Sequence, residues 1–459
     1  NYIGTDVTGT ADLGNSEYGI ALINSTNSNT IGGTIAGSGN LISGNDRSGI
    51  YFFSTAYNIE IYGNYIGTDI NGTSSIGNAR SGIEITGDTF DNTIGGTSSG
   101  MSNIIAFNGE KGIYLNGDGT MTGNRISGNS IHSNTGLGID ISPEGVTPND
   151  ADDSDTGPNG ILNFPVITEI LQTGVETYTV NGTVTQSVSE VELYIVTNST
   201  NSVTADPSGY GEGYSYIDTV IPDGSGNFSL ADVNLSSNAV LTSLSIDGSG
   251  NTSEFGGNKS ISSNDVSITI MDEGVSSVMQ GETDKHLFSF ILSSNTDNAL
   301  WTEFELTGSG TEIDTDITGV KLYADNGNGT FSSSEETLIG SASFTGGGLF
   351  MDITDQNVTT DTAVYFVSVD MATGAVTGSD FTITMADTTN FTILSPDSMN
   401  TFTPFTAGPI TVTDGPDQIT VTSEDMYSPE TKSGVKDVLF EKVTMRTSSE
   451  IAAFKALSI

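Results

Sequence analysis

The chain has no cysteine among its 459 residues, which excludes a disulfide framework and any thiolate metal site. Basic residues are also scarce, with 12 Lys and Arg against 57 Asp and Glu, and the formal net charge is -45. A surface this acidic repels nucleic acid and anionic lipid and attracts cations. The sequence also lacks a signal peptide, a lipidation motif and an apolar run of membrane-spanning length. We therefore expect no nucleic-acid partner and no direct membrane insertion of this segment.

The composition predicts an all-β chain with many turns. Hydrophobic residues make up 35% of the sequence, Gly, Ser, Thr, Asn and Asp are abundant, and no long helical pattern occurs. The length implies about two to four domains. The charge is uneven, because residues 431–459 contain five bases and three acids whereas the rest is strongly acidic. The C-terminal stretch is therefore predicted to be a different kind of segment.

The first third of the chain repeats itself. The words NYIGTD at position 1 and NTIGGT at position 29 return 63 positions later, at positions 64 and 92. Self-similarity at a fixed period is typical of a stacked architecture, in which each unit buries its face only against its neighbours. Because Asn1 stands inside such a repeat, we expect the chain to be a piece of a longer protein.

Gly-Ile pairs open a short alternating strand in each predicted coil of this stack. The pairs begin at Gly19, Gly49, Gly82, Gly112 and Gly138. The apolar residues that follow each glycine fall on one face, which period-two alternation turns inward. Two further short strands separate one pair from the next, and glycines mark the corners. Three strands per turn of roughly 31 residues predict a parallel β-helix.

Polar residues also recur at fixed places in this region. Equivalent asparagines, such as Asn45 and Asn108 or Asn29 and Asn92, are expected to line up along the stack and satisfy one another's amides. His132 follows an inward isoleucine, so we expect it to point outward as a surface histidine.

The repeated sequence motifs resemble those of a known protein family. As a set, NTIGGT, NLISGN, GI and NYIGTD resemble the right-handed parallel β-helix repeats of large bacterial and archaeal cell-surface proteins, over residues 1 to about 142. After Pro143, short strand-like runs divided by turn residues are typical of a β-sandwich. The words DTGPN, NFP, GYGEG, GNFS and GNTSEF resemble the sandwich that follows such repeats in surface proteins.

The expected fold class is therefore all-β, a right-handed parallel β-helix followed by tandem Ig-like β-sandwich domains. The predicted domains are the β-helix at residues 1–145, one sandwich at 146–260 and a second at 261–413. Residues 414–459 are expected to be a linker followed by a partial further β-domain or by a tail that donates a strand to a neighbour.

Two loops place oxygen-bearing side chains at spacings that suit Ca²⁺. The first is the acidic stretch 149–159, for which a free linker is the alternative. The second, 325–336, resembles the calcium loops of surface modules and dockerins, although it is one residue short after Asp325 and has Ser332 where an acid is usual. A plain hairpin loop is the alternative there. The candidate calcium ligands are Asp153, Asp155, Asn159, Asp325, Asn326, Asn328 and Glu335.

Aromatic residues are predicted on the outside of the β-helix. They are Tyr51, Phe53, Tyr65 and Tyr114. Rows of this kind stack on sugar rings or pack against a neighbouring chain, and isolated exposed tyrosines are the alternative. A sugar lyase needs a base and a cation beside its substrate. Arg47 and Lys111, two coils apart, are the candidates, but solvated surface bases are the favoured interpretation.

The favoured function is an extracellular structural or adhesive protein of the cell surface, as a candidate subunit of a fibre or surface layer and stiffened by Ca²⁺. Its expected partners are copies of itself, other surface proteins or a polysaccharide. The alternative is a carbohydrate-active β-helix protein, either an enzyme of the polysaccharide lyase or epimerase kind or a glycan binder. The poverty of catalytic residue types favours a protein that is not an enzyme.

Overall fold

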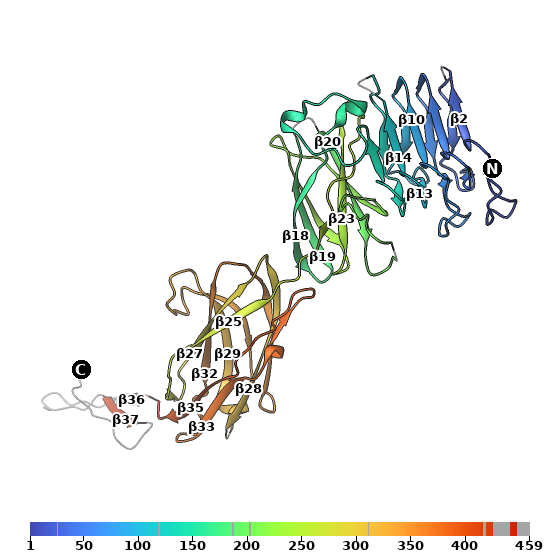
Figure 1. Ribbon diagram of the computed structural model, residues 1–459. Coiled ribbons are helices and arrows are strands. Elements are labelled where there is room, and N and C mark those ends of the chain that lie inside the picture. Colours follow the sequence, from blue (N-terminus) through green and yellow to red (C-terminus); the bar gives the residue numbers. More distant parts are fainter. Residues whose placement is uncertain are drawn as a thin grey trace, which may run out of the picture. The chain divides into compact units, whose positions relative to one another are not determined.

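A computed structural model describes residues 1–24, 26–117, 120–185, 188–201, 203–310 and 312–415, together with the backbone of two later strands. The chain forms two compact units (Figure 1). The first contains Asn1–Asn264 with Leu394–Ser398, and the second contains Asp265–Ile393 with the described residues that follow Ser398. The predicted all-β fold is confirmed, since the described elements other than strands are short helical turns.

Residues 1–141 form a parallel β-helix whose coils stack in register (Figure 1). We name its three long sheets after their sequence words. The Gly-Ile sheet contains β2 (Ile20–Ile23), β6 (Ile50–Phe53), β10 (Ile83–Thr86), β14 (Ile113–Asn116) and β17 (Ile139–Ile141). The NTIGGT sheet contains β4 (Thr30–Gly32), β8 (Glu60–Tyr62), β12 (Thr93–Gly95) and β15 (Arg125–Ser127). The NYIGTD sheet contains β1 (Tyr2–Ile3), β5 (Leu41–Ile42), β9 (Tyr65–Ile66), β13 (Ile104–Ala106) and β16 (Ser130–His132).

The coil differs from the expectation in one respect. A fourth, short sheet of β3 (Thr26–Asn27), β7 (Ala56–Tyr57) and β11 (Thr89–Phe90) lies between the Gly-Ile and NTIGGT sheets in the chain. Its two-residue strands show too few alternations to be detected as a period. The inward residues are as predicted, because Ile50, Phe52 and Ile83 are fully buried in one core with their equivalents.

Asparagines form ladders along the corners of the stack. In one ladder, the Asn45 Nδ2 donates to Asn78 Oδ1 at 2.7 Å, and Asn78 donates in turn to Asn108 at 2.9 Å. Asn108 donates to Asn134 at 2.9 Å. The predicted alignment of Asn45 with Asn108 is thus correct through an intervening coil. Asn29 is an exception, since its amide donates to the Asn27 carbonyl instead.

The rest of the first unit is a sandwich of two antiparallel sheets. The segment that leads into it contains the helical turns η1 (Ala151–Asp153) and η2 (Pro158–Ile161). One sheet contains β18 (Val166–Gly174), β19 (Thr177–Thr183) and β22 (Asn227–Asn234). The other contains β21 (Ser215–Val220), β20 (Val188–Thr197), β23 (Val240–Asp247) and β24 (Lys259–Ser260). Alternating residues such as Val180, Val191 and Leu241 are fully buried between the sheets.

The sandwich closes the last coil of the β-helix. Tyr194, Leu244, Ile246 and Phe255 of the sandwich belong to the hydrophobic core of the β-helix, so the two modules share one core. Backbone donors at the open edge of the last coil also find partners in the sandwich, as where Ile131 N donates to the Gly213 carbonyl at 2.8 Å. An open edge of this kind would otherwise pair with another chain.

Three buried glutamates also pair with the last coil, and each accepts a hydrogen bond from a backbone N–H at the end of one long sheet. Glu192 accepts from the Gly128 N at 2.9 Å, just after β15. Glu212 accepts from the Asn134 N at 2.8 Å, after β16, and also from the amide of that side chain. Glu254 accepts from the N of Ile141, in β17, at 2.9 Å. The Glu212 carboxylate therefore ends the asparagine ladder.

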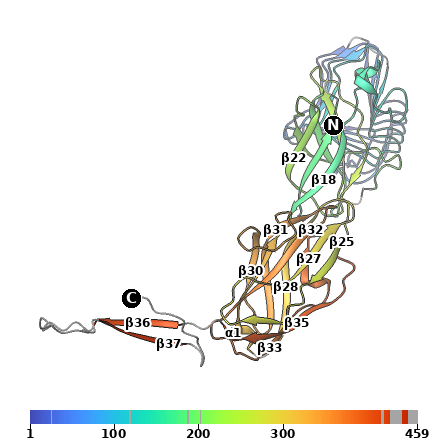
Figure 2. The same cartoon turned by 90° about the vertical axis from the view of Figure 1, so that its left-hand side faces the viewer.

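The second unit is a larger sandwich, whose strands can be followed in Figure 2. One sheet contains β25 (Val266–Asp272), β27 (Lys285–Ser294), β32 (Ala363–Met371), β29 (Ile317–Ala324) and β30 (Thr337–Ala342). The other contains β26 (Ser277–Met279), β35 (Phe405–Thr413), β33 (Asp380–Met385), β28 (Ala299–Gly310) and β31 (Gly348–Val358), with β34 (Phe391–Ile393) beside β28. The short helical elements are α1 (Ile313–Asp316) and η3 (Thr388–Asn390).

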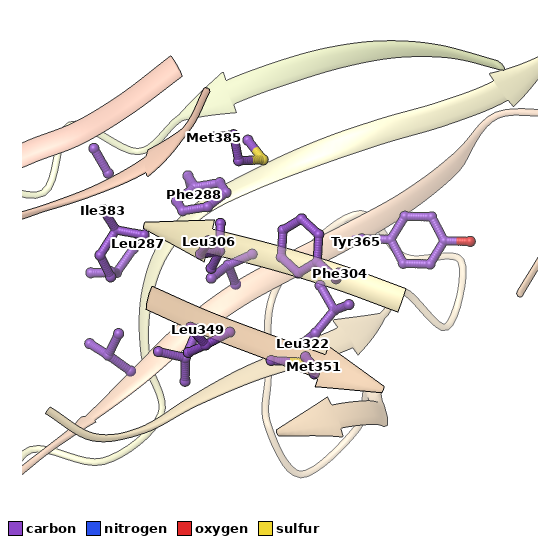
Figure 3. Packing of buried hydrophobic residues seen from close by; sticks show 14 of the residues in the cluster. Leu287, Phe288, Phe304, Leu306, Leu322, Leu349, Met351, Tyr365, Ile383 and Met385 are labelled. Atoms are coloured by element: carbon purple, nitrogen blue, oxygen red, sulfur yellow. The ribbon is translucent and has the colours of Figure 1, made fainter. Parts of the chain in front are cut away.

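Large apolar side chains fill the space between these sheets. Figure 3 shows Phe288, Phe304 and Leu306 of this core together with Leu349 and Met351. The single tryptophan, Trp301, is fully buried in the same core.

A charged cluster ties three segments of the second unit together. The Lys321 Nζ lies 2.7 Å from Asp284 Oδ1 and 2.8 Å from Asp370 Oδ2. Burial opposes the charge on Lys321, but the two carboxylates outweigh it and raise the pKa of its ammonium group above the ordinary range.

The C-terminal segment contains a further two-stranded sheet. β36 (Ile419–Asp425) pairs antiparallel with β37 (Glu441–Thr447). The predicted strand-donating tail, residues 431–459, lies outside the described residues apart from 441–447, whose backbone pairs with β36.

Candidate functional site

The outer face of the Gly-Ile sheet gathers most of the predicted aromatics. The parallel register places Tyr51, Glu84, Tyr114 and Asp140 in one outward row. The Tyr51 ring stacks on Tyr18 with centroids 4.1 Å apart and an interplanar angle of 5°. Phe53 lies 6.1 Å from Tyr51 and about half of it is exposed, with a relative accessibility of 51%. Tyr51, Phe53 and Tyr114 therefore lie on one face, as predicted.

Arg47 lies at one end of this face. Its Nε lies 2.8 Å from Glu17 Oε2, and its Nη1 donates to the Tyr18 hydroxyl at 3.1 Å. The guanidinium also lies 5.4 Å from the centroid of the Tyr18 ring, which is a cation–π distance. Arg47 is thus held in place against an aromatic ring.

Lys111 lies at the other end of the face. Its Nζ is 4.7 Å from the Tyr114 ring centroid, lies 3.9 Å from Asp140 Oδ2, and forms an ion pair with Glu144. Burial opposes its charge, but the hydrogen bond that Lys111 donates to Glu144 and the negative charge of Asp140 outweigh burial and raise the pKa of Lys111. A lyase base must be neutral when it removes a proton. The carboxylates hold Lys111 protonated, so this cluster favours binding over proton abstraction.

Two residues of this face were not among the predicted site residues. Tyr18 precedes Gly19 just as Lys111 precedes Gly112, so its position in the repeat was a usable signal. Glu84 accepts a hydrogen bond from the Ser48 hydroxyl at 2.6 Å and lies between two tyrosines of the row. Its place was also available from the sequence, because Glu84 follows Gly82-Ile83 just as Tyr51 follows Gly49-Ile50.

Tyr65 lies on a different face from the other three aromatics. It belongs to the outward row of the NYIGTD sheet, with Tyr2, Leu41 and Ile104. This row forms the floor of a trough with a volume of about 490 Å³. The predicted aromatic set therefore divides between two surfaces of the β-helix.

The first predicted calcium loop is partly used by the fold. Asn159 is fully buried, and its Oδ1 accepts from the Asn124 N at 3.1 Å, which extends another asparagine ladder. Asp153 accepts from the Asn163 N at 2.8 Å, while Asp155 is partly buried. The amide oxygen of Asn159 is thus engaged within the β-helix stack, away from solvent.

The second predicted calcium loop is held by its own backbone. Asp325 accepts from the Gly329 N at 3.1 and 3.0 Å, and the side chains of Asn326 and Asn328 accept from Asn328 N and Thr330 N. Glu335 is exposed. Its neighbour Glu336 is buried, with one carboxylate oxygen accepting from Asn326 N at 2.6 Å and the other lacking a hydrogen-bond partner.

Within the described part of the chain, no three His, Cys, Asp or Glu side chains are grouped so as to hold a metal ion. Calcium therefore stays a prediction. His132 does not lie at the surface as expected, because its ring is buried against Tyr214 of the sandwich at 4.9 Å. Burial lowers the pKa of His132 to about 4.

Comparison with known proteins gives little further guidance. No family model matches the chain. A structure of a DUF4466 family protein from Parabacteroides merdae is 11% identical, with a TM-score of 0.20, over 36% of this chain and 50% of that one. This chain thus spans only half the length of that structure.

Two bacterial surface proteins are also similar in part. The B domain of a biofilm associated protein is 10% identical, with a TM-score of 0.20, over 53% of this chain and 83% of that one. The partial N-terminal region of an enterococcal surface protein is 7% identical, with a TM-score of 0.18, over 51% and 89%. TM-scores this low do not support an inference about function.

No helix among the described residues has the length and apolar character needed to cross a bilayer.

Proposed function

We propose that this chain acts as an extracellular cell-surface protein with a structural and adhesive role, and as a candidate subunit of a fibre or surface layer. The main support for this proposal is the closed core of the first unit. The β-helix and its sandwich share one hydrophobic cluster, and three buried glutamates pair with the last coil. Such a joint resists bending, because any opening exposes apolar side chains and leaves buried donors unpaired.

The outer face of the Gly-Ile sheet is the proposed contact surface for a second copy or for another surface protein. It presents Phe53 and the stacked pair Tyr18 and Tyr51. Aromatic rings held in place by stacking lose little conformational freedom when a partner covers them. The acidic remainder of the surface keeps copies apart except where such a patch, or a bound cation, overcomes the repulsion.

Electron microscopy and sedimentation of the native full-length material at near-physiological salt test this proposal. We expect ordered fibres or a lattice, and we expect the double variant Tyr51→Ser/Phe53→Ser to reduce assembly. Tyr57 is a matched control, because it stacks on Phe90 at 5.0 Å in the short fourth sheet. Tyr57→Ser should leave assembly unchanged. Separate particles under all conditions would refute the structural role.

A further inference from the structure

The trough over the NYIGTD sheet has a composition unlike the rest of the molecule. Its lining includes Tyr2, Ile35, Asn40, Leu41, Tyr65 and Ile104. None of its lining residues has a charged side chain, although Asp, Glu, Lys and Arg make up 15% of the chain and its net charge is -45. The volume of about 490 Å³ falls within the range of binding pockets for small ligands.

The lack of charged side chains in the lining indicates which class of ligand the trough suits. An anionic polymer would meet no Lys, Arg or His side chain in the trough, and the acidic surface of the chain would repel it. A cationic ligand would find no carboxylate in the lining to pair with. The lining offers aromatic and aliphatic side chains, amides, hydroxyls and the exposed backbone of several glycines. This combination suits a ligand that has apolar faces and uncharged hydroxyl groups.

Two tyrosines are spaced for a polymer along the stack. The register places Tyr2 and Tyr65 two strands apart, with Leu41 between them, which corresponds to about 10 Å. A Cβ added at Gly72 would lie 2.9 Å from the Tyr65 ring, so the loop backbone packs directly against that ring and fixes its position. Ile35 stands at the rim with a relative exposure of 78%.

We propose that this trough binds a neutral polysaccharide, with sugar rings lying on Tyr2 and Tyr65 and the sugar chain running along the β-helix axis. The apolar face of a pyranose packs on an aromatic ring, while its hydroxyls pair with amide, hydroxyl and backbone groups. This inference deepens the proposed adhesive role by naming a ligand class, and in that sense it rests on the proposed function.

Isothermal titration of the full chain with soluble oligosaccharides tests the inference. The neutral probes are oligomers of β-glucan, mannan and N-acetylglucosamine, and the acidic probes are oligogalacturonate and hyaluronan fragments. We expect at least one neutral probe to bind, with affinity rising with oligomer length up to the span of the two tyrosines. Tyr65→Ala should weaken this binding about tenfold or more, whereas Tyr65→Phe should retain most of it because the ring remains.

Ile35→Ser provides a variant that is safe for folding, since this side chain is largely exposed, and it should weaken binding severalfold. Tyr57→Ser, in the short fourth sheet, should leave binding unchanged. Binding confined to the acidic probes, no binding by any neutral probe, or equal binding by Tyr65→Ala would each overturn the inference. Assembly measured on the same Tyr65→Ala sample separates the two proposals, because assembly that persists without glycan binding refutes this inference alone.

Discussion

Replacement of Glu212 by glutamine should change how the stability of the first unit depends on pH. Glu212 has a relative exposure of 1% and ends the asparagine ladder by accepting from Ser133 and Asn134. Burial raises the pKa of Glu212 from 4.5 to about 7, despite the opposing effect of these hydrogen bonds. The folded state therefore holds a proton that the unfolded state releases near pH 4.5. The resulting stability is fully present below that pH and is lost as pH rises to about 7.

The magnitude follows from the same values. Between pH 5 and pH 7.5 the loss should be about 2–3 kcal/mol for Glu212, at 1.36 kcal/mol per pKa unit. His132 acts in the opposite direction, because its lowered pKa adds stability as pH rises from about 4 to 6.5. The wild-type profile thus mixes opposing contributions. The difference between wild type and Glu212→Gln removes the His132 contribution, since both proteins contain it.

Urea unfolding at pH 5 and pH 7.5, followed by circular dichroism, provides the assay. The wild type should lose about 2–3 kcal/mol more than Glu212→Gln between these two pH values. Trp301 fluorescence reports the second unit, which does not contain Glu212, and its midpoint should match in both proteins. Glu176→Gln, at an exposed position of the same sandwich, should behave as wild type. Identical pH dependence in wild type and Glu212→Gln would refute the reasoning.

Three further predictions concern the ladders, the charged cluster and calcium. Asn108→Ala removes the acceptor of two buried Asn78 donors and should lower the free energy of unfolding of the first unit by about 3–5 kcal/mol, measured by urea unfolding. The control Asn116→Ala, at an exposed position, should cost less than about 0.5 kcal/mol. Lys321→Met removes the cation that two carboxylates share and should lower the free energy of unfolding of the second unit, measured by urea unfolding with Trp301 fluorescence, by about 1–3 kcal/mol. The control Lys285→Met, which breaks one ion pair with Glu282, should have a much smaller effect. If Ca²⁺ occupies the 325–336 loop, chelator should lower the urea midpoint of the second unit followed by Trp301 fluorescence, and Glu336→Gln should abolish this response. An unchanged midpoint with chelator would contradict Ca²⁺ binding at this loop.

Periodicity explains why the β-helix was predictable. Each Gly-Ile strand carries two inward apolar residues, and repetition shows that the pattern is not accidental, as for Ile50 and Ile83. The same logic identified Asn45 and Asn108 as equivalent. In the second sandwich, β31 alternates buried and exposed residues up to Thr354, and its alternation is then interrupted at Asp355.

The contacts between modules were not predictable. His132 carries the pattern of an outward residue, and it does point away from the β-helix core, but the sandwich covers it. Nothing near His132 in the sequence indicates that Tyr214 lies against it. Glu192, Glu212 and Glu254 have the same difficulty, since a buried glutamate looks like any surface acid until its partners are known.

The candidate site was predictable only in part. Outward placement of Tyr51 and Tyr114 follows from alternation within one strand type. The separation of Tyr65 from them depends on which sheet of the coil each strand joins, and that is set by the corners. The uncharged lining of the trough comes from segments as distant as Tyr2 and Ile104, so it has no local signature.

The ladder that ends on Glu212 has a consequence for how such proteins change length. The carboxylate accepts from Asn134 as each asparagine oxygen accepts from the coil before it, so the terminus of the stack presents the same chemistry as its interior. A pair of coils gained or lost by recombination between the 63-residue repeats would leave this joint unaltered. The reach of the protein is thus a quantity that evolution can adjust in steps without redesigning the junction.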